Sequence, residues 1–309
     1  MRTSRRTPIL AAFPLFALLL SASVHAAPLP SRVFVSPTGS DSNNCANPTT
    51  PCLTFAGAMS QVADAGEIMV LATSGYGPLS ITRSVLINAP AGVTAYSCCT
   101  VVINAPHATV SLRGITIDGA GKAQNGIQVA NVGTLYVDNC LITGFTGPPS
   151  TTAGNGLWFG SPGHLFVTNT TVRGNSQIGI MIQPVDPLSG STQTAHASID
   201  HCHLDGNGTG LLSDINTSTV VRYSFAAGNL YDGFAAQNAG VLNVEDCVAT
   251  SNGNGIGAYA TSAIYVSNTT VTGNNKGLNV AFASLLSRSN NTVENNGTNG
   301  SFNFTFAAK

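Results

Sequence analysis

A glycine-led repeat of about 22 residues runs through most of this chain and limits the folds that it can adopt. Each repeat joins a small-residue turn to a short apolar strand, and its glycines are Gly126, Gly156, Gly179, Gly210, Gly233, Gly255 and Gly277. Most intervals are 22 or 23 residues, and two of 30 and 31 residues indicate insertions. One period suits three short strands with three turns, which is one coil of a parallel β-helix. We therefore expect an all-β, right-handed parallel β-helix, a solenoid of about nine coils.

Two asparagine-rich columns appear when the repeats are aligned. The first column reads Asn139, Asn169, His201, Tyr223, Asp246, Asn268 and Asn290. The second, six residues further on, reads Phe145, Asn175, Asn207, Asn229, Asn252, Asn274 and Asn296. Asparagine tolerates left-handed turn geometry, and its amide can bond the amide one coil away. Stacked in this way, the two columns should stabilise the turns of the coils.

The seven cysteines fall into three groups. Cys45 and Cys52 bracket a short loop, and we expect them to form a disulfide in an oxidising compartment. Cys140, Cys202 and Cys247 share one column two coils apart, roughly 9 to 10 Å, which is too far for a disulfide and indicates packing thiols. The vicinal pair Cys98-Cys99 has no assigned partner. No Cys-x-x-Cys spacing occurs, so a metal site is disfavoured.

The N-terminal region divides into an export signal and a cap. Residues 1–26 combine Arg2, Arg5 and Arg6, an apolar run and a small-residue cleavage site, which predicts a signal peptide and a secreted or periplasmic protein. Residues 27–66 are expected to cap the coils of residues 67–309. Within that cap, residues 54–65 show the spacing of a helix, with apolar positions Phe55, Ala58, Met59 and Val62. Such a helix would cover the open end of the solenoid.

Charge and hydropathy argue against two classes of partner. Only 8% of residues are charged, and removal of the signal leaves nine basic against thirteen acidic residues. A mildly acidic surface argues against nucleic acid. No segment after the signal is apolar and long enough for membrane insertion. The sequence leaves the oligomeric state open.

The chain resembles the pectin lyase-like superfamily of right-handed β-helices, in particular secreted bacterial β-helix repeat proteins. The resemblance rests on the start of the mature chain, at residues 33–41, Cys45, Pro51-Cys52 and Thr54-Phe55, and on residues 75–81 with 84–87. It covers essentially the whole mature chain. That superfamily includes polysaccharide lyases, hydrolases, epimerases, phage depolymerases and adhesins, so the resemblance implies the fold without selecting an activity.

The outward positions of the first sheet supply the main candidate site. They read Gln128, Trp158, Met181, Leu212, Ala235, Gly257 and Asn279 in one column, and Ala130, Gly160, Gln183, Asp214, Gln237, Tyr259 and Ala281 in the next. An inverting glycosidase needs two carboxylates about 6.5 to 9.5 Å apart, and this face offers only Asp214. The residue types instead suit sugar stacking and hydroxyl binding. The predicted substrate-binding residues are Trp158, Gln183, Asp214, Gln237 and Tyr259.

The two insertions are expected to wall this face. Residues 146–153 enlarge the turn before Trp158, and residues 184–195 enlarge the turn after Met181. They would form a groove floored by Trp158, Met181, Gln183 and Asp214. An equally weighted interpretation packs Trp158 under one of the loops.

A second cluster contains the candidate catalytic residues Asp200, His203 and Asp205. Asp200 shares a column with Arg222 in the next coil, and Arg173 shares one with Asp205. A histidine with carboxylates and arginines could abstract a proton from a uronate. The competing interpretation is a ladder of surface ion pairs between neighbouring coils.

Two functions remain open. The favoured one is binding of a polysaccharide or another cell-surface glycan along the first-sheet face without catalysis and without a cofactor. The alternative is a polysaccharide lyase, or related carbohydrate-active enzyme, acting on uronate-containing polymers, with Ca²⁺ as its metal. Asp214 and Asp232 are too few to define a calcium site. A structural or adhesin-like role without a sugar ligand is the third option, so enzymatic activity stays undecided.

Overall fold

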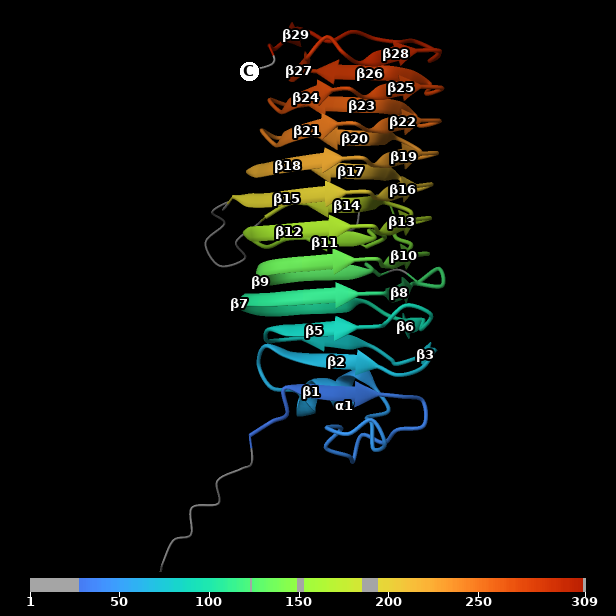
Figure 1. The fold of residues 1–309 in the computed structure, drawn as a ribbon. Helices are drawn as coiled ribbons and strands as arrows, with labels where there is room; N and C mark the ends of the chain where they lie inside the picture. The colour runs from blue at the N-terminus through green and yellow to red at the C-terminus, as the bar shows by residue number, and fades with distance from the viewer. Residues whose placement is uncertain (1–27, 123, 149–152, 185–193, 308–309) are drawn as a thin grey trace, which may run out of the picture.

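The computed structural model describes residues 28–122, 124–148, 153–184 and 194–307. Its strands stack into about nine coils that rise from the N-terminal to the C-terminal end (Figure 1). Every pairing between its described strands is parallel, as in β12 (Gly163–Thr168) with β15 (Ala195–Asp200). The predicted parallel β-helix is therefore confirmed, and with it the fold that the family resemblance implied. The predicted signal peptide, 1–26, lies outside the described residues.

The coils form three ladders of strands. The first ladder contains β4 (Leu79–Ile81), the first parts of β7 (Val101–Arg113) and β9 (Ile127–Asp138), β11 (Leu157–Phe159), β14 (Ile178–Ile182), β17 (Thr209–Ser213), β20 (Asp232–Ala236), β23 (Asn254–Tyr259) and β26 (Lys276–Ala281). The second contains β1 (Arg32–Val35), β2 (Gly66–Val70), β5 (Val85–Asn88), the later parts of β7 and β9, β12, β15, β18 (Thr217–Arg222), β21 (Val241–Glu245), β24 (Ala263–Ser267), β27 (Ser284–Ser287) and β29 (Phe304–Thr305). The third is a 10-stranded sheet of β3 (Ser74–Gly75), β6 (Ala95–Ser97), β8 (Ile115–Asp118), β10 (Leu141–Thr143), β13 (Thr171–Arg173), β16 (His203–Asp205), β19 (Phe225–Ala227), β22 (Val248–Thr250), β25 (Thr270–Thr272) and β28 (Thr292–Glu294). Because β7 and β9 span two ladders, the first and second ladders join into one 19-stranded sheet.

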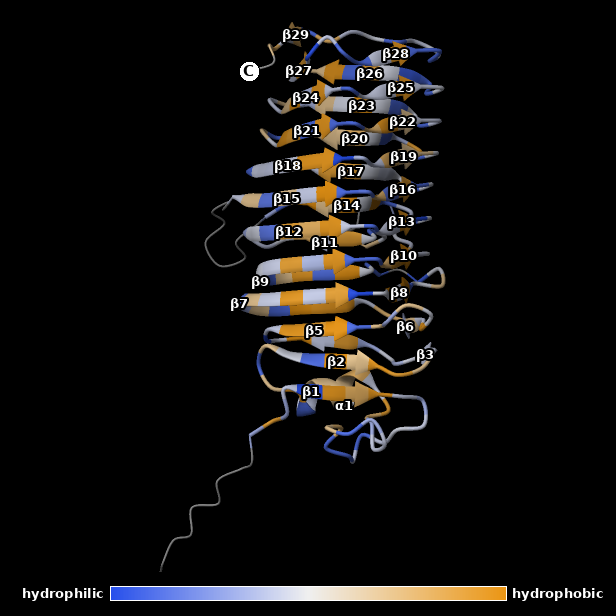
Figure 2. Ribbon diagram, in the orientation of Figure 1, coloured by the Kyte–Doolittle hydropathy of each residue, from blue (hydrophilic) through white to orange (hydrophobic). Residues whose placement is uncertain are grey.

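The core is a stack of inward-facing apolar side chains. Alternate residues of the strands point inward, which Figure 2 shows as alternating colours along β7 and β9. On the third ladder one inward column is completely buried and reads Ile142, Val172, Leu204, Ala226, Ala249 and Val271. A one-residue slip would turn such a column outward, so the pattern fixes the register.

The second asparagine column forms an internal amide ladder, as predicted. Asn175, Asn207, Asn229, Asn252 and Asn274 are each at most 2% exposed. The Asn252 Oδ1 accepts from the Asn229 backbone N–H at 3.0 Å and from the Asn229 Nδ2 at 2.8 Å. Its own Nδ2 donates to the Ala226 carbonyl at 2.9 Å. The ladder therefore satisfies backbone groups that a buried turn would otherwise leave unpaired.

The first column lies at an outer turn with left-handed backbone geometry. Its φ angles lie between 46° and 53° at Asn139, Asn169, His201, Tyr223, Asp246 and Asn268. In the last coil the positive φ falls on Ser289 instead of Asn290, because Asn290 places its Oδ1 against the Asn268 N–H at 3.0 Å. The turn geometry predicted from the asparagines thus holds in six coils and shifts by one residue in the seventh.

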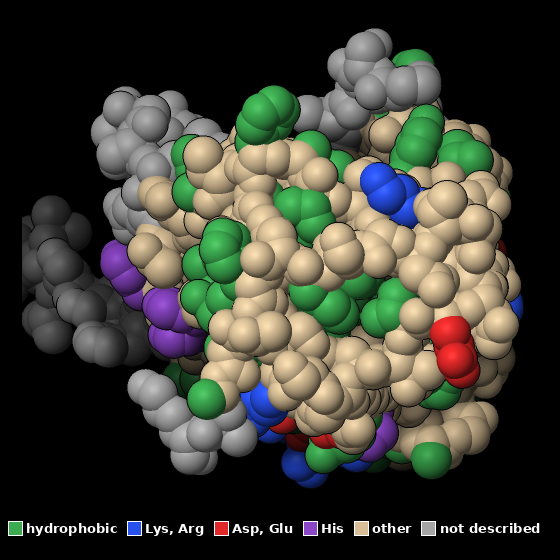
Figure 3. Space-filling model, turned by 90° about the horizontal axis from the view of Figure 1, so that it is seen from above, with side chains coloured by type: hydrophobic (Ala, Val, Ile, Leu, Met, Phe, Trp, Pro, Cys, Tyr) green, Lys and Arg blue, Asp and Glu red, His purple; other side chains and the backbone are tan. Residues whose placement is uncertain are grey.

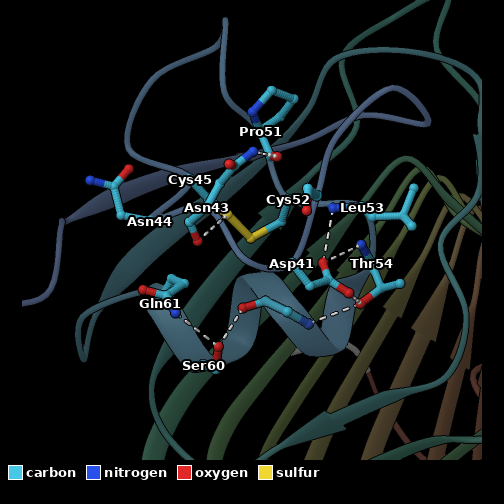
Figure 4. Close-up of a disulfide and its surroundings, with 12 residues drawn as sticks. Asp41, Asn43, Asn44, Cys45, Pro51, Cys52, Leu53, Thr54, Ser60 and Gln61 are labelled. Atoms are coloured by element: carbon cyan, nitrogen blue, oxygen red, sulfur yellow. Dashed lines mark hydrogen bonds between the residues drawn. A yellow bond between two sulfur atoms is a disulfide. The ribbon is translucent and has the colours of Figure 1, made fainter.

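The N-terminal end is closed by a helix and a disulfide. Helix α1 (Phe55–Gln61) starts at Thr54, whose hydroxyl accepts from the Gly57 N–H at 3.0 Å. Its buried side chains include Phe55, Ala58 and Met59 at the predicted spacing, but the helix ends at Gln61, and Val62, predicted as a fourth helical position, is its extended C-cap. Beside it the predicted disulfide joins Cys45 and Cys52, and Asp41 holds the adjoining loop through the Leu53 and Thr54 amides (Figure 4).

The parallel ladder begins inside the segment 27–66. Arg32 of β1 pairs with Glu67 of β2, and their side chains form an ion pair at 2.7 Å. Among the described residues, no helix is long and apolar enough to span a bilayer.

Candidate functional site

The first ladder presents the two predicted columns on its outer face. Trp158 pairs with Gln128 on one side and with Met181 on the other. The same column continues to Leu212, Ala235, Gly257 and Asn279. The registers derived from the repeat are therefore correct across seven coils.

Asp214 links two other predicted binding residues, Gln183 and Gln237, into one hydrogen-bonded unit. Its Oδ2 accepts from the Gln183 Nε2 at 2.9 Å and from the Gln237 Nε2 at 3.0 Å. Its Oδ1 accepts from the Asn238 Nδ2 at 2.9 Å and from the Ile215 N–H at 2.7 Å. The side chain is buried, with 1% exposure. Asp214 thus fixes the amides of the coils before and after its own.

Trp158 is half-buried next to this unit. Its ring lies above Gly160, where an added Cβ would be 3.5 Å from the ring atoms Cε2 and Cζ2. The indole Nε1 is buried and has no hydrogen-bond partner among the described residues. A buried donor without a partner is costly, and a buried nitrogen is out of reach of a ligand, so only the exposed part of the Trp158 ring is available for stacking.

Tyr259 belongs to a different hydrogen-bonded group at the C-terminal end of the same face. Its hydroxyl donates to the Asp232 Oδ1 at 2.7 Å and accepts from the Asn279 Nδ2 at 3.1 Å. The Asn254 Nδ2 also donates to Asp232, at 2.9 Å. Burial raises the pKa of Asp232, and burial followed by the nearby Asp232 carboxylate raises the pKa of Tyr259.

Sequence reasoning missed the role of Asp232. Asp232 stands at the first position of β20, two residues before the inward-facing Phe234, whereas Tyr259 ends β23. They meet above Gly257, where an added Cβ would lie 2.3 Å from Asp232 and 2.5 Å from the Tyr259 hydroxyl. The signal in the sequence was a glycine in an outward column otherwise filled by larger side chains.

The candidate catalytic residues lie on two ladders of strands. Asp200 ends β15 on the second ladder, and its carboxylate pairs with the His201 Nδ1 at 2.9 Å. His203 and Asp205 lie beyond the turn, on β16 of the third ladder, with the His203 Nδ1 3.7 Å from Asp205. The predicted columns of Asp200 with Arg222 and Arg173 with Asp205 are present in register. Among the described side chains, neither of these two pairs comes within ion-pair distance.

Asp205 is a carboxylate with a raised pKa. Burial raises its pKa, while His203, a backbone hydrogen bond and Arg173 oppose that effect. Its Oδ1 is buried and has no hydrogen-bond partner among the described residues. The neighbouring His203 ring is exposed and stacks on Phe225 at 5.2 Å between centroids. Asp205 and His203 are therefore a carboxylate–imidazole pair at an accessible edge.

The second ladder also carries a set of stacked rings that the repeat pattern of the first-sheet face did not predict. Tyr136 and Phe166 stack with 5.0 Å between ring centroids, and His164 and His196 with 5.5 Å. The rings occupy outward positions of β9, β12 and β15. Alternating apolar and polar residues in these strands were the available signal.

The remaining cysteines are free thiols. Burial raises the pKa of Cys140 to about 12, of Cys202 to about 11 and of Cys247 to about 12. They fill a column of small residues, as predicted. Cys98 and Cys99 face each other with 2.8 Å between sulfurs, and Cys98 is exposed.

The predicted groove walls fall largely on 149–152 and 185–193, which lie outside the described residues, so the groove stays a prediction. The C-terminal end of the molecule carries few charged side chains (Figure 3). Within the described ranges, no three His, Cys, Asp or Glu side chains gather as a metal site.

Comparison with known proteins found solved structures of low sequence identity. No family model matches it, and the search of curated proteins found no match either. Among solved structures, it is similar to the pectate lyase Pel9A, with 16% identity and a TM-score of 0.49 over 83% of this chain and 67% of that one. It is also similar to a rhamnogalacturonan lyase, with 11% identity and a TM-score of 0.37 over 82% and 74%. A third is a lacto-N-biosidase from Eubacterium ramulus, with 8% identity and a TM-score of 0.31 over 90% and 67%. The function must therefore be argued from the side chains of this chain.

Proposed function

We propose that this protein binds a glycan along the outer face of the first ladder and leaves it chemically unchanged. The observation that carries this proposal is the Asp214 unit. One buried carboxylate holds the amides of Gln183 and Gln237, which flank it in the neighbouring coils. Each glutamine keeps its Oε1 for a sugar hydroxyl, because only its Nε2 is used by Asp214. Side chains held in advance lose less entropy when a ligand binds.

The rest of the face supplies complementary groups. Trp158, half-buried two coils from Asp214, offers the exposed part of an aromatic ring. Tyr259 and Asn279 extend the polar surface toward the C-terminal end. An apolar floor with a few well-placed polar groups is typical of sugar sites.

Hydrolysis is disfavoured by the state of Asp214. Its two oxygens accept four hydrogen bonds, and its exposure is 1%. A general acid or nucleophile has to reach the glycosidic oxygen or anomeric carbon, and a second carboxylate has to stand across the bond. Asp214 acts here as a positioning group for amides.

The proposed setting is outside the cytoplasm. The predicted signal peptide would direct the chain to the periplasm or the medium, where a polysaccharide or cell-surface glycan is the partner. The Cys45–Cys52 disulfide fits an oxidising compartment. Binding of this kind requires no cofactor.

The alternative is lyase activity on uronate-containing polymers, and one observation favours it. Asp205 has a raised pKa and lies beside the exposed His203. Perturbed carboxylates of this kind occur at catalytic sites. A calcium requirement would accompany this alternative and would not accompany the binding function.

The test is equilibrium binding of the purified protein to pectin, alginate, hyaluronan, xylan and bacterial exopolysaccharides, with and without Ca²⁺. We expect binding of at least one polymer, with no new reducing ends and no unsaturated uronate absorbance. Replacing Gln183 and Gln237 by Ala should weaken binding about tenfold each, since each removes one sugar hydrogen bond of about 1.4 kcal/mol.

Asn243→Ala is the matched control, because Asn243 lies on an outward position of the second ladder. The affinity of the Asn243→Ala variant for the polymer should equal that of the unmodified protein. Release of unsaturated product, abolished by His203→Ala, would replace the binding proposal by the lyase alternative.

A further inference from the structure

The outer face of the second ladder contains an interrupted stack of rings. In β9 and β12 the second outward column holds Tyr136 and then Phe166, whose rings are nearly parallel, at 13°. Beside them, His164 of β12 stacks on His196 of β15 with 20° between ring planes. Consecutive coils thus place ring upon ring, separated by about the strand spacing.

The stack stops at Ser198. This residue pairs with Phe166 and stands in the column where the next ring would follow, while His196 on the same strand still carries one. In the next coil the partners of His196 and Ser198 are Ser218 and Val220. One face of the Phe166 ring is therefore covered by Tyr136, and the other is turned toward a position without a ring.

A depression of about 200 Å³ lies at this position. Its lining consists of His164, Phe166, His196, Ala197, Ser198, Ser218 and Val220. Phe166 and Val220 stand two coils apart, roughly 9 to 10 Å, which leaves the thickness of one ring between them. The depression matches the place of the missing ring in the stack.

The polar groups around the depression are free to bind a ligand. The side chains of His164, His196, Ser198 and Ser218 make no hydrogen bond to any other described residue. Further along the same outward face stand Asp200 and Arg222, which pair in register at the ends of β15 and β18. Hydroxyl and imidazole groups beside one apolar ring face suit a ligand with an apolar face and several hydroxyls.

We propose that this depression binds one neutral pyranose ring, stacked on Phe166 above Ser198. The apolar face of the sugar stacks on the Phe166 ring. The edge of the sugar lies beside the His196 ring, in the same way that the Phe166 ring lies beside the His164 ring. Its hydroxyls bond to Ser198, Ser218 and the imidazole of His196. This site lies on the second ladder, so it goes beyond the first-ladder function, and either can fail without the other.

The experiment follows the ring C–H signals of the histidines by NMR in the full-length protein labelled with ¹³C-histidine. The probes are the methyl β-glycosides of glucose, galactose and mannose. We expect at least one of them to shift the His164 and His196 signals in a saturable way. The His203 signal should stay in place, because His203 lies on the third ladder.

Ser198→Phe supplies the missing ring from the protein itself. It should weaken binding of the shifting glycoside by about tenfold or more, while the thermal unfolding temperature is retained. Ser111→Phe is the matched control: Ser111 pairs with Tyr136 and extends the same stack at its other end, away from the depression. Its affinity should stay within about twofold of the unmodified protein. If Ser198→Phe does not fold, Phe166→Leu removes the stacking face and should weaken binding similarly.

Three results would overturn the proposal: no shift of His164 and His196 with any of the probes, unaltered binding by Ser198→Phe, or equal loss in Ser111→Phe. Trp158→Ala separates this site from the first-ladder function. It should leave the histidine shifts intact even where it weakens polysaccharide binding. Intact histidine shifts without any Trp158-dependent or glutamine-dependent polymer binding would support this site and refute the first-ladder function alone.

Discussion

Buried asparagines stabilise this molecule by pairing backbone groups that strands cannot reach. The Oδ1 of each ladder asparagine accepts hydrogen bonds from the asparagine one coil earlier, and its Nδ2 donates to a backbone carbonyl. Asn274 does so toward Asn252 and Ala249. Because these groups are shielded from water, each lost partner costs about 1 to 3 kcal/mol. The column was predictable from sequence since the same residue recurs at the same place in six repeats.

Replacing Asn252 by Ala should therefore lower the free energy of unfolding by about 3 kcal/mol or more. The change leaves the Asn229 N–H without its side-chain acceptor and removes the amide bond to the Ala226 carbonyl. Urea unfolding followed by circular dichroism measures the loss. Asn243→Ala, at a half-buried outward position, should change the same quantity by less than about 0.5 kcal/mol. Equal effects of the two variants would contradict the ladder's role.

The buried thiols predict how stability depends on pH. Burial raises the pKa of Cys140, Cys202 and Cys247 to about 11 or 12, from 9.0. The pKa of each thiol is higher in the folded state than in the unfolded state. The stabilisation by the neutral buried thiol is therefore complete below the unfolded-state pKa and is lost as pH rises toward the folded-state pKa. Each thiol should thus cost roughly 1.4 kcal/mol of stability per pH unit between pH 9 and 11.

The triple variant with serine at all three positions tests this dependence. Serine already fills the column at Ser224, so the fold should be retained. Its unfolding midpoint in urea should fall less steeply than that of the unmodified protein as pH rises above 9. Parallel pH profiles would show that these thiols do not govern alkaline stability.

The columns of a strand ladder were predictable from sequence where one residue type repeats. Contacts between unlike side chains of neighbouring coils were less predictable. The outward columns of the first ladder followed directly from the repeat length. The Asp232–Tyr259 contact did not, because it depends on empty space above Gly257. The turn at His201 and Cys202 places Asp200 and His203 on different ladders, which spacing along the chain does not reveal.

Gly257→Ala should break the contact between Tyr259 and Asp232. The new Cβ would overlap both groups, so the tyrosine must move toward solvent and its raised pKa should fall toward the ordinary value of 10.0. Ultraviolet titration of the tyrosines measures this change. Gly75→Ala is the control, since nothing lies within 4 Å of an added Cβ there. An unchanged titration in Gly257→Ala would show that Tyr259 is not held by Asp232.

The described coils form a rod that is closed at its N-terminal end by α1 and the Cys45–Cys52 loop (Figure 1). Repetition made this architecture predictable from sequence, and helical spacing and a short loop between two cysteines did the same for the cap helix and the disulfide. The site was only partly readable. Chemistry here depends on which outward side chains of separate coils bond to one another, as Asp214 does with Gln183 and Gln237.

The most direct test of the proposed function is a crystal structure of the protein soaked with an oligosaccharide of the polymer that it binds. The account predicts an intact sugar chain on the first ladder, hydrogen-bonded to the Oε1 atoms of Gln183 and Gln237. A sugar lying instead against His203 and Asp205, or a cleaved chain carrying an unsaturated end, would contradict it.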